Sequence, residues 1–415
     1  MLDGAAGEGE GEERQEVWAQ GASGRARVTE SGIQRDGAPL SRLDVRVLHV
    51  TPYFPPTWAY GGIPRVVVAL GQAQARQGAD VRVWTTDAFD RTSRAGVSPR
   101  RSFDGIDVHT SRLLSNRLAW SQQLFLPTTL PPLDGVDVVH LHGHRHLLNF
   151  AAFHAARRAG IPIVQTPNGT LPRIERKVTA KRVWDWVFDG DVPLQVDALV
   201  ATSRAEVRDF LLAGVAGSRI RRIPNGLVLE DFANLPPRGS FRALHGWGPE
   251  PLVVYLGQIT PRKGVEHLVA ACAKIPNVRL AIAGSARGMA LPAGNAHYLG
   301  TLEGPERLRL LVDADVLVYA SAREVFGLVP LEGLLCGAPV IVGGDCGCGE
   351  MITEAGAGLL VDHGDVDSLT TSIRTLLSDQ GRAEEMVRRG QAWIAHNADS
   401  DKVAARYLDL YRELA

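Results

Sequence analysis

The chain has 415 residues, of which 45% are hydrophobic, so it can bury two ordinary cores and two domains are expected. Its 45 lysines and arginines nearly balance its 46 aspartates and glutamates, which excludes the bulk basic field typical of proteins that bind nucleic acid. No apolar run approaches the roughly 18 residues of a membrane-spanning helix, and the first residues lack the apolar core of a secretory signal.

The four cysteines all fall in the second half of the chain, which indicates a reduced, cytoplasmic protein rather than a disulfide framework. Cys346 and Cys348 are one residue apart, but neither a histidine nor a second cysteine pair stands beside them. Two thiols in that arrangement are a weak metal signal, so no metal site is expected.

Residues 1–43 are rich in glycine, glutamate and arginine and poor in large apolar residues. Such a segment cannot offset the entropy of ordering, so we expect a disordered extension. From residue 44 onward, short apolar strands alternate with helices of 10 to 15 residues in both halves of the chain. This alternation predicts two doubly wound α/β domains, at 44–226 and 251–395, joined by a linker rich in proline and glycine at 227–250.

The first domain opens with a strand over 45–50, a helix over 63–77 and a strand over 81–85, which together predict a right-handed parallel unit. Gly61 and Gly62 stand at the start of the helix, where bare backbone can approach a phosphate. Two glycines before a helix are also common as a plain turn.

Histidines alternate at the end of the next strand, over 136–141. Because ligands gather at the carboxyl ends of parallel strands, His140 and His142 are expected to face the cleft. With His144 and His146 they also fit the pattern of a metal-binding tract.

Basic and aromatic residues follow the strand over 161–166 and its loop, Pro167-Asn168-Gly169-Thr170. Such a helix favours contact with anionic lipid or with a phosphorylated acceptor, or is a solvated face whose tryptophans enter the core. The residues are Arg173, Arg176, Lys177, Lys181, Arg182, Trp184 and Trp186.

In the second domain, a strand over 316–319 leads through a polar, glycine-containing loop into a helix over 330–336. Pro330 suits the first helical position, so the free amides of Gly327, Leu328 and Val329 should attract an anion. Glu324 precedes this helix and Glu332 lies in its first turn, which suits a ligand rich in hydroxyls as well as phosphate. The same two carboxylates also fit a solvated loop residue and an acidic residue favoured by the helix dipole.

The stretch from Glu324 to Glu332, EVFGLVPLE, resembles the E-x7-E motif of retaining, nucleotide-sugar-dependent glycosyltransferases of the GT-B fold, group 1 or family 4. The resemblance covers about residues 45–415 and is strongest over 253–361. It implies two facing Rossmann-like domains with a cleft between them and a C-terminal helix, within 396–415, that returns to the first domain. It also implies transfer of a sugar from a UDP- or GDP-type donor to a hydroxyl, with retention at the anomeric carbon and no required metal or cofactor.

The resemblance assigns roles residue by residue. His142 matches the second histidine of the family's His-x-His strand end, Lys263 the lysine of its G-R-x-x-x-x-K-G loop, and Glu324 the carboxylate that holds the transferred sugar. These three are the candidate catalytic residues. The candidate donor-binding residues are Gly61, Gly62, Gln258, Arg262, Lys263, Tyr298, Glu324, Phe326, Gly327, Leu328, Val329 and Glu332.

Two positions depart from the family's pattern. Gln258 replaces the arginine that helps neutralise the leaving diphosphate, unless Arg262 takes its place, and Asn168 stands where the family often has a histidine. Asn168 and Arg173 are the candidate acceptor-side residues.

The implied partners are a nucleotide sugar and a saccharide or lipid-linked acceptor of polysaccharide or glycolipid biosynthesis. The predicted location in the cell is the cytoplasm, with peripheral membrane contact through residues 173–186. A donor-binding subunit without turnover, a sugar phosphorylase and a sugar-nucleotide epimerase are the alternatives.

Overall fold

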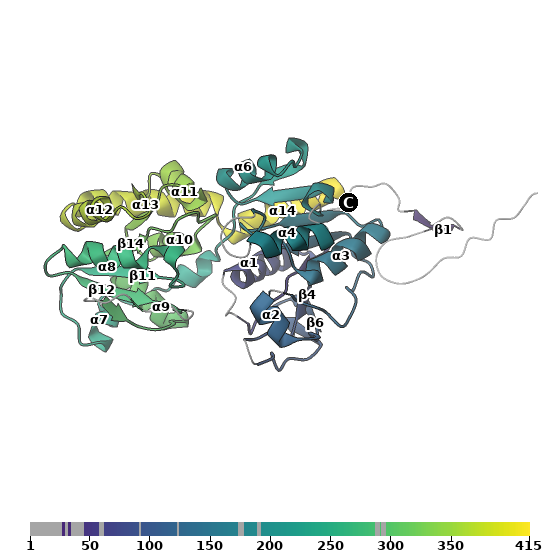
Figure 1. Ribbon diagram of the computed structural model, residues 1–415, viewed down its shortest axis with the longest axis horizontal. Coiled ribbons are helices and arrows are strands. Elements are labelled where there is room, and N and C mark those ends of the chain that lie inside the picture. Colours follow the sequence, from purple (N-terminus) through teal and green to yellow (C-terminus); the bar gives the residue numbers. More distant parts are fainter. Residues whose placement is uncertain are drawn as a thin grey trace, which may run out of the picture. The chain divides into compact units, whose positions relative to one another are not determined.

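The structure is a computed structural model (Figure 1), and it describes residues 27–29, 32–34, 45–57, 62–90, 93–122, 124–172, 178–188, 192–286, 291 and 296–415. The chain divides into two compact units, Met1–Ser41 and Arg42–Ala415. In the first unit, β1 (Arg27–Thr29) and β2 (Gly32–Gln34) pair antiparallel. The rest of residues 1–43 lies outside the described residues, so the predicted disorder stays a prediction.

The first lobe of the second unit is built on an eight-stranded sheet of order β10-β9-β8-β7-β3-β4-β6-β5. All neighbours are parallel except the edge pair β5 and β6. The strands are β3 (Arg46–Val50), β4 (Asp80–Thr86), β5 (Arg100–Phe103), β6 (Ile106–Ser111), β7 (Val138–His142), β8 (Ile163–Thr166), β9 (Ala198–Ala201) and β10 (Ile220–Arg222). Its helices are α1 (Ile63–Arg76), α2 (Asn116–Gln122), α3 (Leu147–Arg158), α4 (Val178–Val187), α5 (Val192–Gln195) and α6 (Arg204–Leu212).

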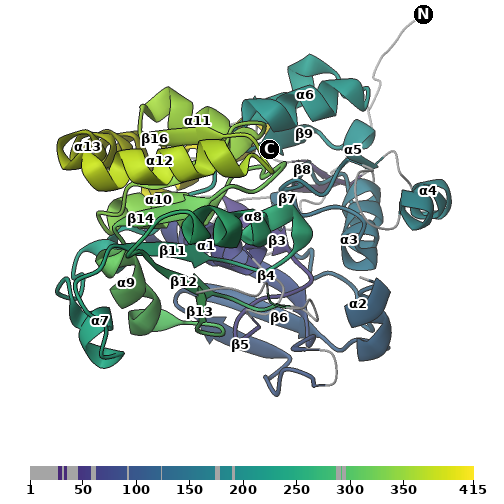
Figure 2. The same ribbon diagram turned by 60° about the vertical axis from the view of Figure 1, so that its left-hand side comes forward.

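The second lobe is built on a six-stranded, wholly parallel sheet of order β13-β12-β11-β14-β15-β16. Its strands are β11 (Leu252–Leu256), β12 (Arg279–Ala283), β13 (Ala296–Tyr298), β14 (Val316–Tyr319), β15 (Val340–Gly343) and β16 (Gly358–Val361). Its helices are α7 (Ser240–Leu244), α8 (Val265–Ala273), α9 (Gly304–Asp313), α10 (Leu328–Leu335), α11 (Gly347–Ala355), α12 (Val366–Ser378) and α13 (Gln380–Asn397), of which α11, α12 and α13 lie beside β16 (Figures 1 and 2).

The central strands of both sheets are buried and mostly apolar because helices cover both faces, although β3, β7 and β8 also carry buried polar residues. Every residue of β11, β14 and β15 is buried, and so is every residue of β7, β8 and β9. In each sheet the strand order reverses beside the first strand, between β3 and β7 and between β11 and β14. Ligands of open α/β sheets bind outside the carboxyl ends of the strands at such a switch point.

The last helix, α14 (Ser400–Leu414), packs along α1 of the first lobe (Figure 1). The start of α14 contacts the start of the linker: the amide of Ser400 donates to the carbonyl of Leu227 over 2.9 Å. Tyr407 and Tyr411 are both buried, so the two tyrosines one turn apart form the packing edge of this helix.

The helix that follows β14 begins earlier than predicted. α10 starts at Leu328, and Gly327 precedes it with a left-handed φ of 77°. Pro330 is therefore the third residue of the helix rather than the first, and Glu332 lies in the second turn. Among the described residues, no helix is both long and apolar enough to span a membrane.

Candidate active site

The N-termini of α1 and α10, one from each lobe, face each other. A Cβ added at Gly62, which precedes α1, would lie 3.7 Å from the Cδ1 of Leu328, the first residue of α10. The first amides of a helix have no acceptor within the helix and carry its positive dipole end. The two helix ends together therefore favour an anion such as a phosphate.

Gly327 sets the direction of α10 at this point. Its backbone is left-handed, and a Cβ there would come within 2.7 Å of the Cys348 Sγ. A side chain would be strained by both the backbone conformation and the contact. Gly61 lies outside the described residues.

A charged cluster lies on the loops that follow β11 and β14. The Lys263 ammonium donates to the Tyr319 hydroxyl over 2.5 Å and to the Glu324 carboxylate, and it lies 4.4 Å from the Tyr319 ring centroid. Lys263 is 8% exposed. Burial and the Glu324 carboxylate hold the pKa of Tyr319 well above its ordinary value, while Arg262 acts in the opposite direction. Tyr319 therefore stays protonated between the lysine and the glutamate.

Gln258 belongs to the same cluster through its backbone. The Tyr255 hydroxyl donates to the Gln258 carbonyl over 2.7 Å, and the Tyr255 ring stacks on that of Tyr319 at 6.2 Å. The charge of Arg262 is felt by both tyrosines, since it lowers the pKa of each against the larger, raising effect of burial. Arg262 thus brings positive charge to the two tyrosines of this cluster.

Glu332 is held by two arginines that the sequence analysis did not single out. Arg307 of α9 donates to one carboxylate oxygen, and Arg65 of α1 lies 3.5 Å from the other. The Glu332 side chain is 8% exposed. Arg65 lies in the first turn of α1, shortly after Gly61 and Gly62, and this position could have marked it as a candidate site residue. Nothing in the sequence around Arg307 indicated a contact with Glu332.

Arg65, Arg307 and Glu332 line a cavity between the lobes. Its volume is about 310 Å³, and its walls come from α1, the start of the linker, α9 and α10. The polar residues in its lining are Arg65, Gln72, Asp231, Glu303, Arg307 and Glu332.

His142 lies at the end of β7 in a cluster with His49 of β3 and His140. His49 Nδ1 is 2.9 Å from His142 Nε2, and the His140 and His142 rings are 4.1 Å apart. Burial lowers the pKa of His49 to about 4 and lowers the pKa of His140 and His142 well below the ordinary value. All three rings are therefore neutral at pH 7. His49 was not predicted, although a histidine inside the apolar run VRVLHV was a visible signal.

The three rings have the residue types of a metal centre, and one nitrogen from each lies within 4.8 Å of the others. Five of their six nitrogens have hydrogen-bond partners. The contact between His49 and His142 has the length of a hydrogen bond, shorter than the separation of about 3.3 Å between two nitrogens on one tetrahedral zinc. The geometry is that of a hydrogen-bonded network.

The loop after β8 contacts the loop that carries Glu324. Asn168 has a left-handed φ of 51°, and its Oδ1 accepts from Asn225 Nδ2 over 3.1 Å. A Cβ at Gly169 would lie 2.4 Å from Val325 Cγ2. The Gly169 amide donates over 2.7 Å to Glu206, a buried carboxylate whose pKa burial raises. Asn168 is thus fixed beside the E-x7-E loop, while Arg173 lies outside the described residues.

Phe326 and Tyr298 are two further residues that were predicted to bind the donor. The Phe326 side chain is 4% exposed and belongs to the hydrophobic core of the second lobe. Tyr298 ends the edge strand β13 and is partly buried, and this burial raises its pKa.

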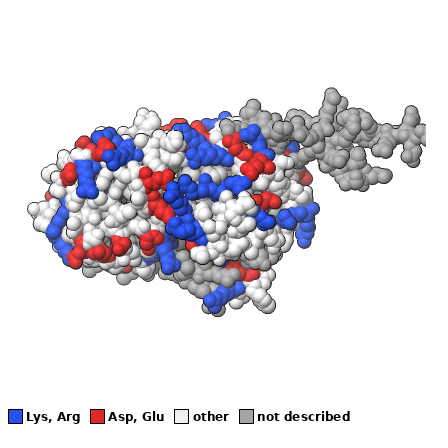
Figure 3. Space-filling view, turned by 90° about the horizontal axis from the view of Figure 1, so that it is seen from above, with Lys and Arg blue, Asp and Glu red and all other residues white. Residues whose placement is uncertain are grey.

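Glu350 joins the two lobes. From α11 it accepts from the Ala205 amide at the start of α6 over 2.9 Å and from Arg208 over 2.5 Å. Glu354 lies 4.0 Å from Arg204 and 3.7 Å from Arg222. Basic side chains of the first lobe therefore meet acidic ones of α11, and Figure 3 shows blue and red groups side by side on the face seen from above.

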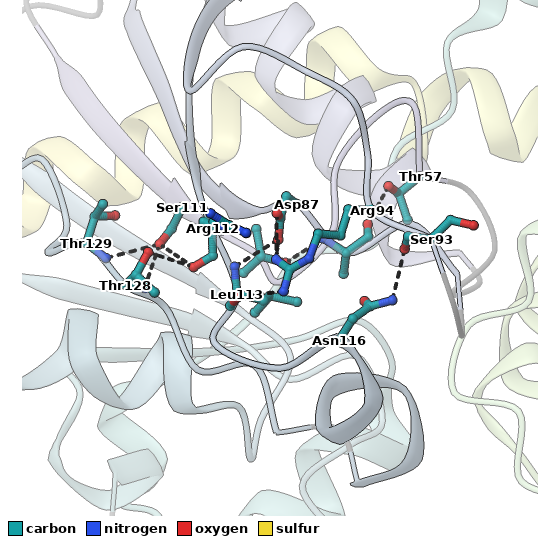
Figure 4. A network of polar contacts seen from close by, with 12 residues as sticks. Thr57, Asp87, Ser93, Arg94, Ser111, Arg112, Leu113, Asn116, Thr128 and Thr129 are labelled. Carbon is teal, nitrogen blue, oxygen red and sulfur yellow. Dashed lines mark hydrogen bonds and ion pairs between the residues drawn. The ribbon is translucent and has the colours of Figure 1, made fainter.

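A polar network that the sequence did not predict ties together the loops after β4 and β6 (Figure 4). Arg94 donates to both Asp87 oxygens and to the Leu113 carbonyl, and Asp87 accepts from the Leu113 amide over 2.8 Å. Because these loops leave the carboxyl ends of the strands, the network fixes the rim of the first lobe on the cleft side.

Two family profiles match the chain. The family described as glycosyl transferases group 1 matches residues 240–393, and the one described as glycosyltransferase family 4 matches residues 60–231. Together they span both lobes.

Curated relatives cover nearly the whole chain. A D-inositol 3-phosphate glycosyltransferase from Xylanimonas cellulosilytica is 28% identical over 90% of this chain and 96% of its own. A GDP-mannose-dependent alpha-mannosyltransferase from Mycobacterium tuberculosis is 29% identical over 84% and 93%.

Solved structures share the fold. The sucrose-phosphate synthase of Thermosynechococcus elongatus superposes with a TM-score of 0.70 at 20% identity, covering 89% of this chain and 99% of its own. HepE of Anabaena, solved in complex with UDP-glucose, gives a TM-score of 0.70 at 18% identity, covering 89% and 100%. With its two parallel-dominated sheets, the chain belongs to the group 1, family 4 glycosyltransferases of the GT-B fold.

Proposed function

We propose that this glycosyltransferase moves a sugar from a nucleoside-diphosphate sugar to a hydroxyl group, with retention at the anomeric carbon. The observation that carries the proposal is the pair of facing helix N-termini, beside which Lys263, Glu324 and Glu332 lie. The names of the relatives, which include GDP-mannose-dependent enzymes, and the UDP-glucose bound by HepE support a nucleotide-sugar donor.

In this proposal the donor diphosphate lies between α1 and α10. The amides of Leu328 and Val329, the backbone at Gly62 and the Lys263 ammonium face the negative charge that grows as the diphosphate departs. Such preorganised donors contribute more in the transition state than in the ground state. Glu332 holds the ribose hydroxyls, and Tyr298 forms a wall of the nucleobase pocket.

The transferred sugar lies beyond the diphosphate, against Glu324 and His142. The bond from the anomeric carbon to the phosphate oxygen breaks, a bond to the acceptor oxygen forms on the same face, and the acceptor proton passes to the departing phosphate. Because His142 is neutral, it holds a sugar hydroxyl and does not donate a proton as an imidazolium. Asn168 and Arg173 are the residues proposed to recognise the acceptor, and no metal is required by this scheme.

The test of this proposal is a panel of UDP-, GDP- and ADP-sugars, scored for release of the nucleoside diphosphate and for nucleotide binding. We expect release from one donor and, with a hydroxyl acceptor, a product whose anomeric configuration matches the donor by proton NMR. An inverted product would exclude retention. Tight binding without release in the presence of lipid and oligosaccharide extracts would favour the donor-binding subunit, and dependence of turnover on inorganic phosphate would favour a phosphorylase.

For the acceptor we propose a lipid-linked or surface-polysaccharide precursor, reached by peripheral contact with the membrane. The support is α4, where Trp186 is 86% exposed and Val183 and Val187 are also exposed. Trp184 packs on Phe188 at 4.7 Å. Trp184 is thus partly buried, whereas Trp186 lies exposed with Val183 and Val187, as apolar residues do in helices that lie in a membrane interface.

Sedimentation with vesicles tests this contact. We expect binding to anionic but not to neutral vesicles, weakened by Trp186→Ser and by charge reversal of Arg176, Lys177 and Lys181. Leu212→Ser, which changes an exposed leucine of α6, is the matched control and should leave binding intact. Binding that survives the charge reversal would exclude the proposed contact.

A further inference from the structure

A chain of buried hydrogen bonds connects His142 to the C-terminal helix. His142 Nε2 meets His49 Nδ1 at 2.9 Å, and His49 Nε2 meets the Gln74 Oε1 of α1 at 2.7 Å. Gln74 Nε2 donates to the Tyr411 hydroxyl of α14 over 3.4 Å, and that hydroxyl lies 2.7 Å from His140 Nδ1. All five side chains are buried, so water does not compete for these bonds.

The hydrogen bonds run in one direction along this chain. Gln74 Oε1 can only accept, so His49 Nε2 carries the proton, and because His49 is neutral its Nδ1 must accept. The partner on that side, His142 Nε2, is therefore the donor. Since His142 is also neutral, its Nδ1 is left unprotonated, with a lone pair.

His142 Nδ1 is buried and has no hydrogen-bond partner among the described residues. Buried polar atoms are nearly always paired, so an unpaired one needs an explanation. His142 lies next to Gly143, where a Cβ would be 3.9 Å from Ile63, the first residue of α1. The backbone that follows His142 is thus near the helix end that faces α10.

We infer that His49, Gln74 and Tyr411 are positioning residues that hold His142 in one tautomer, with Nδ1 ready to accept a hydrogen bond from a hydroxyl of the transferred sugar. This inference rests on the proposed function. It also defines a substrate class. The unprotonated nitrogen accepts a hydrogen bond from a hydroxyl at that position, makes none with a deoxy sugar and repels a carboxylate. The donor sugar is therefore a neutral hydroxylated sugar at that position and not a uronic acid.

The tautomer can be read without any substrate. Long-range proton–nitrogen correlation spectra of the full chain labelled with ¹⁵N-histidine distinguish protonated from unprotonated ring nitrogens, and His142→Asn assigns the signals. We expect His142 with Nε2 protonated and Nδ1 unprotonated. Tyr411→Phe and Gln74→Met should replace this single state by a mixture of tautomers.

Tyr407→Phe is the matched control. It removes a buried hydroxyl from the same helix, but that hydroxyl bonds Thr166 Oγ1, which can rotate and leaves the His142 side of the chain unchanged. A wild-type His142 protonated on Nδ1, or a His142 spectrum unchanged in Gln74→Met, would overturn the inference.

The second measurement uses the donor found in the panel. We expect Gln74→Met to lower kcat about tenfold, the effect of one misaligned hydrogen bond, while the affinity for the nucleoside diphosphate alone is unchanged. With a donor that lacks the recognised hydroxyl, Gln74→Met should have the same kcat as the wild type. A tenfold lower kcat with that donor as well would overturn the inference. The predicted tautomer in a chain that releases no nucleotide would instead refute the proposed function.

Discussion

The positive charge beside the proposed diphosphate site comes from neighbouring residues of one loop. Lys263 is bound to Glu324 and Tyr319, so part of its charge is already neutralised. Arg262 acts on the same tyrosine from nearby. Because Gln258 provides no charge, we interpret Arg262 as the second cation of this loop.

This interpretation predicts the behaviour of a double variant. Arg262→Ala should lower kcat about tenfold or more, because a preorganised charge at the leaving group is lost. Adding Gln258→Arg to that variant should restore much of the loss, whereas Gln258→Leu should not. Steady-state rates of nucleoside diphosphate release measure both effects. No rescue by Gln258→Arg would mean that Arg262 acts elsewhere.

Arg307 orients the carboxylate that is proposed to hold the ribose. Removing one partner of a largely buried ion pair leaves the other charge uncompensated and free to turn. We expect Arg307→Met to weaken the binding of UDP or GDP about tenfold by isothermal titration calorimetry. Arg309→Met, two residues on in α9, is the control and should bind as the wild type does. Equal affinities for both variants would contradict the role of Arg307.

At the scale of elements, α6 and α11 form the contact that closes one side of the cleft. Glu350 accepts from the first turn of α6, where a carboxylate is favoured by the free amides and the helix dipole. Gly347, the first residue of α11, lies so close that a Cβ would be 2.0 Å from the Val325 carbonyl oxygen and 2.5 Å from Ser203 Oγ. The lobes meet here through backbone, with no room for a side chain.

Gly347→Ala should therefore separate these elements. We expect a loss of about 1 to 3 kcal/mol in the free energy of unfolding, as for other overpacked contacts. A lower kcat/KM should accompany it, because Val325 lies inside the E-x7-E loop. Urea titration and donor turnover measure the two effects. Gly217→Ala is the control, since its Cβ would meet only Leu211 at 3.9 Å, and equal stability of the two variants would refute the close contact.

At the scale of the whole molecule, the three neutral histidines link stability to pH. In the unfolded chain they take up protons near pH 6.5, whereas burial lowers the folded pKa of His49 to about 4 and lowers those of His140 and His142 as well. Between these values the unfolded state binds more protons than the folded state. The free energy of unfolding must therefore fall as the pH falls through this window.

We expect the free energy of unfolding to drop between about pH 6.5 and pH 4 by roughly 3 kcal/mol from His49 alone. Urea titrations at several pH values measure this slope. His49→Gln should flatten it, and His396→Gln, which changes an exposed histidine of α13, should not. A stability that is independent of pH in the wild type over this range would contradict the neutral network.

The sequence allowed the α/β fold to be predicted because its buried strands are apolar runs and its helices are periodic. The loops after β11 and β14 were also predictable, since a switch point brings strand ends together. The pairing of Lys263 with Glu324, and of Arg65 with Glu332, could not be predicted. The first pair is separated by 61 positions in the sequence and the second by 267. Their contacts therefore depend on the three-dimensional fold. α10 begins earlier than predicted because Gly327, not Pro330, sets its start.

Two lysines of the second lobe allow a direct test of the proposed diphosphate site. Lys263 lies beside the proposed diphosphate, whereas Lys274 pairs on the surface with Asp367 at 2.6 Å. With the donor identified by the panel, we predict that Lys263→Ala slows release of the nucleoside diphosphate about a hundredfold or more, while Lys274→Ala releases it at the wild-type rate. Equal rates for the two variants would contradict the proposed site.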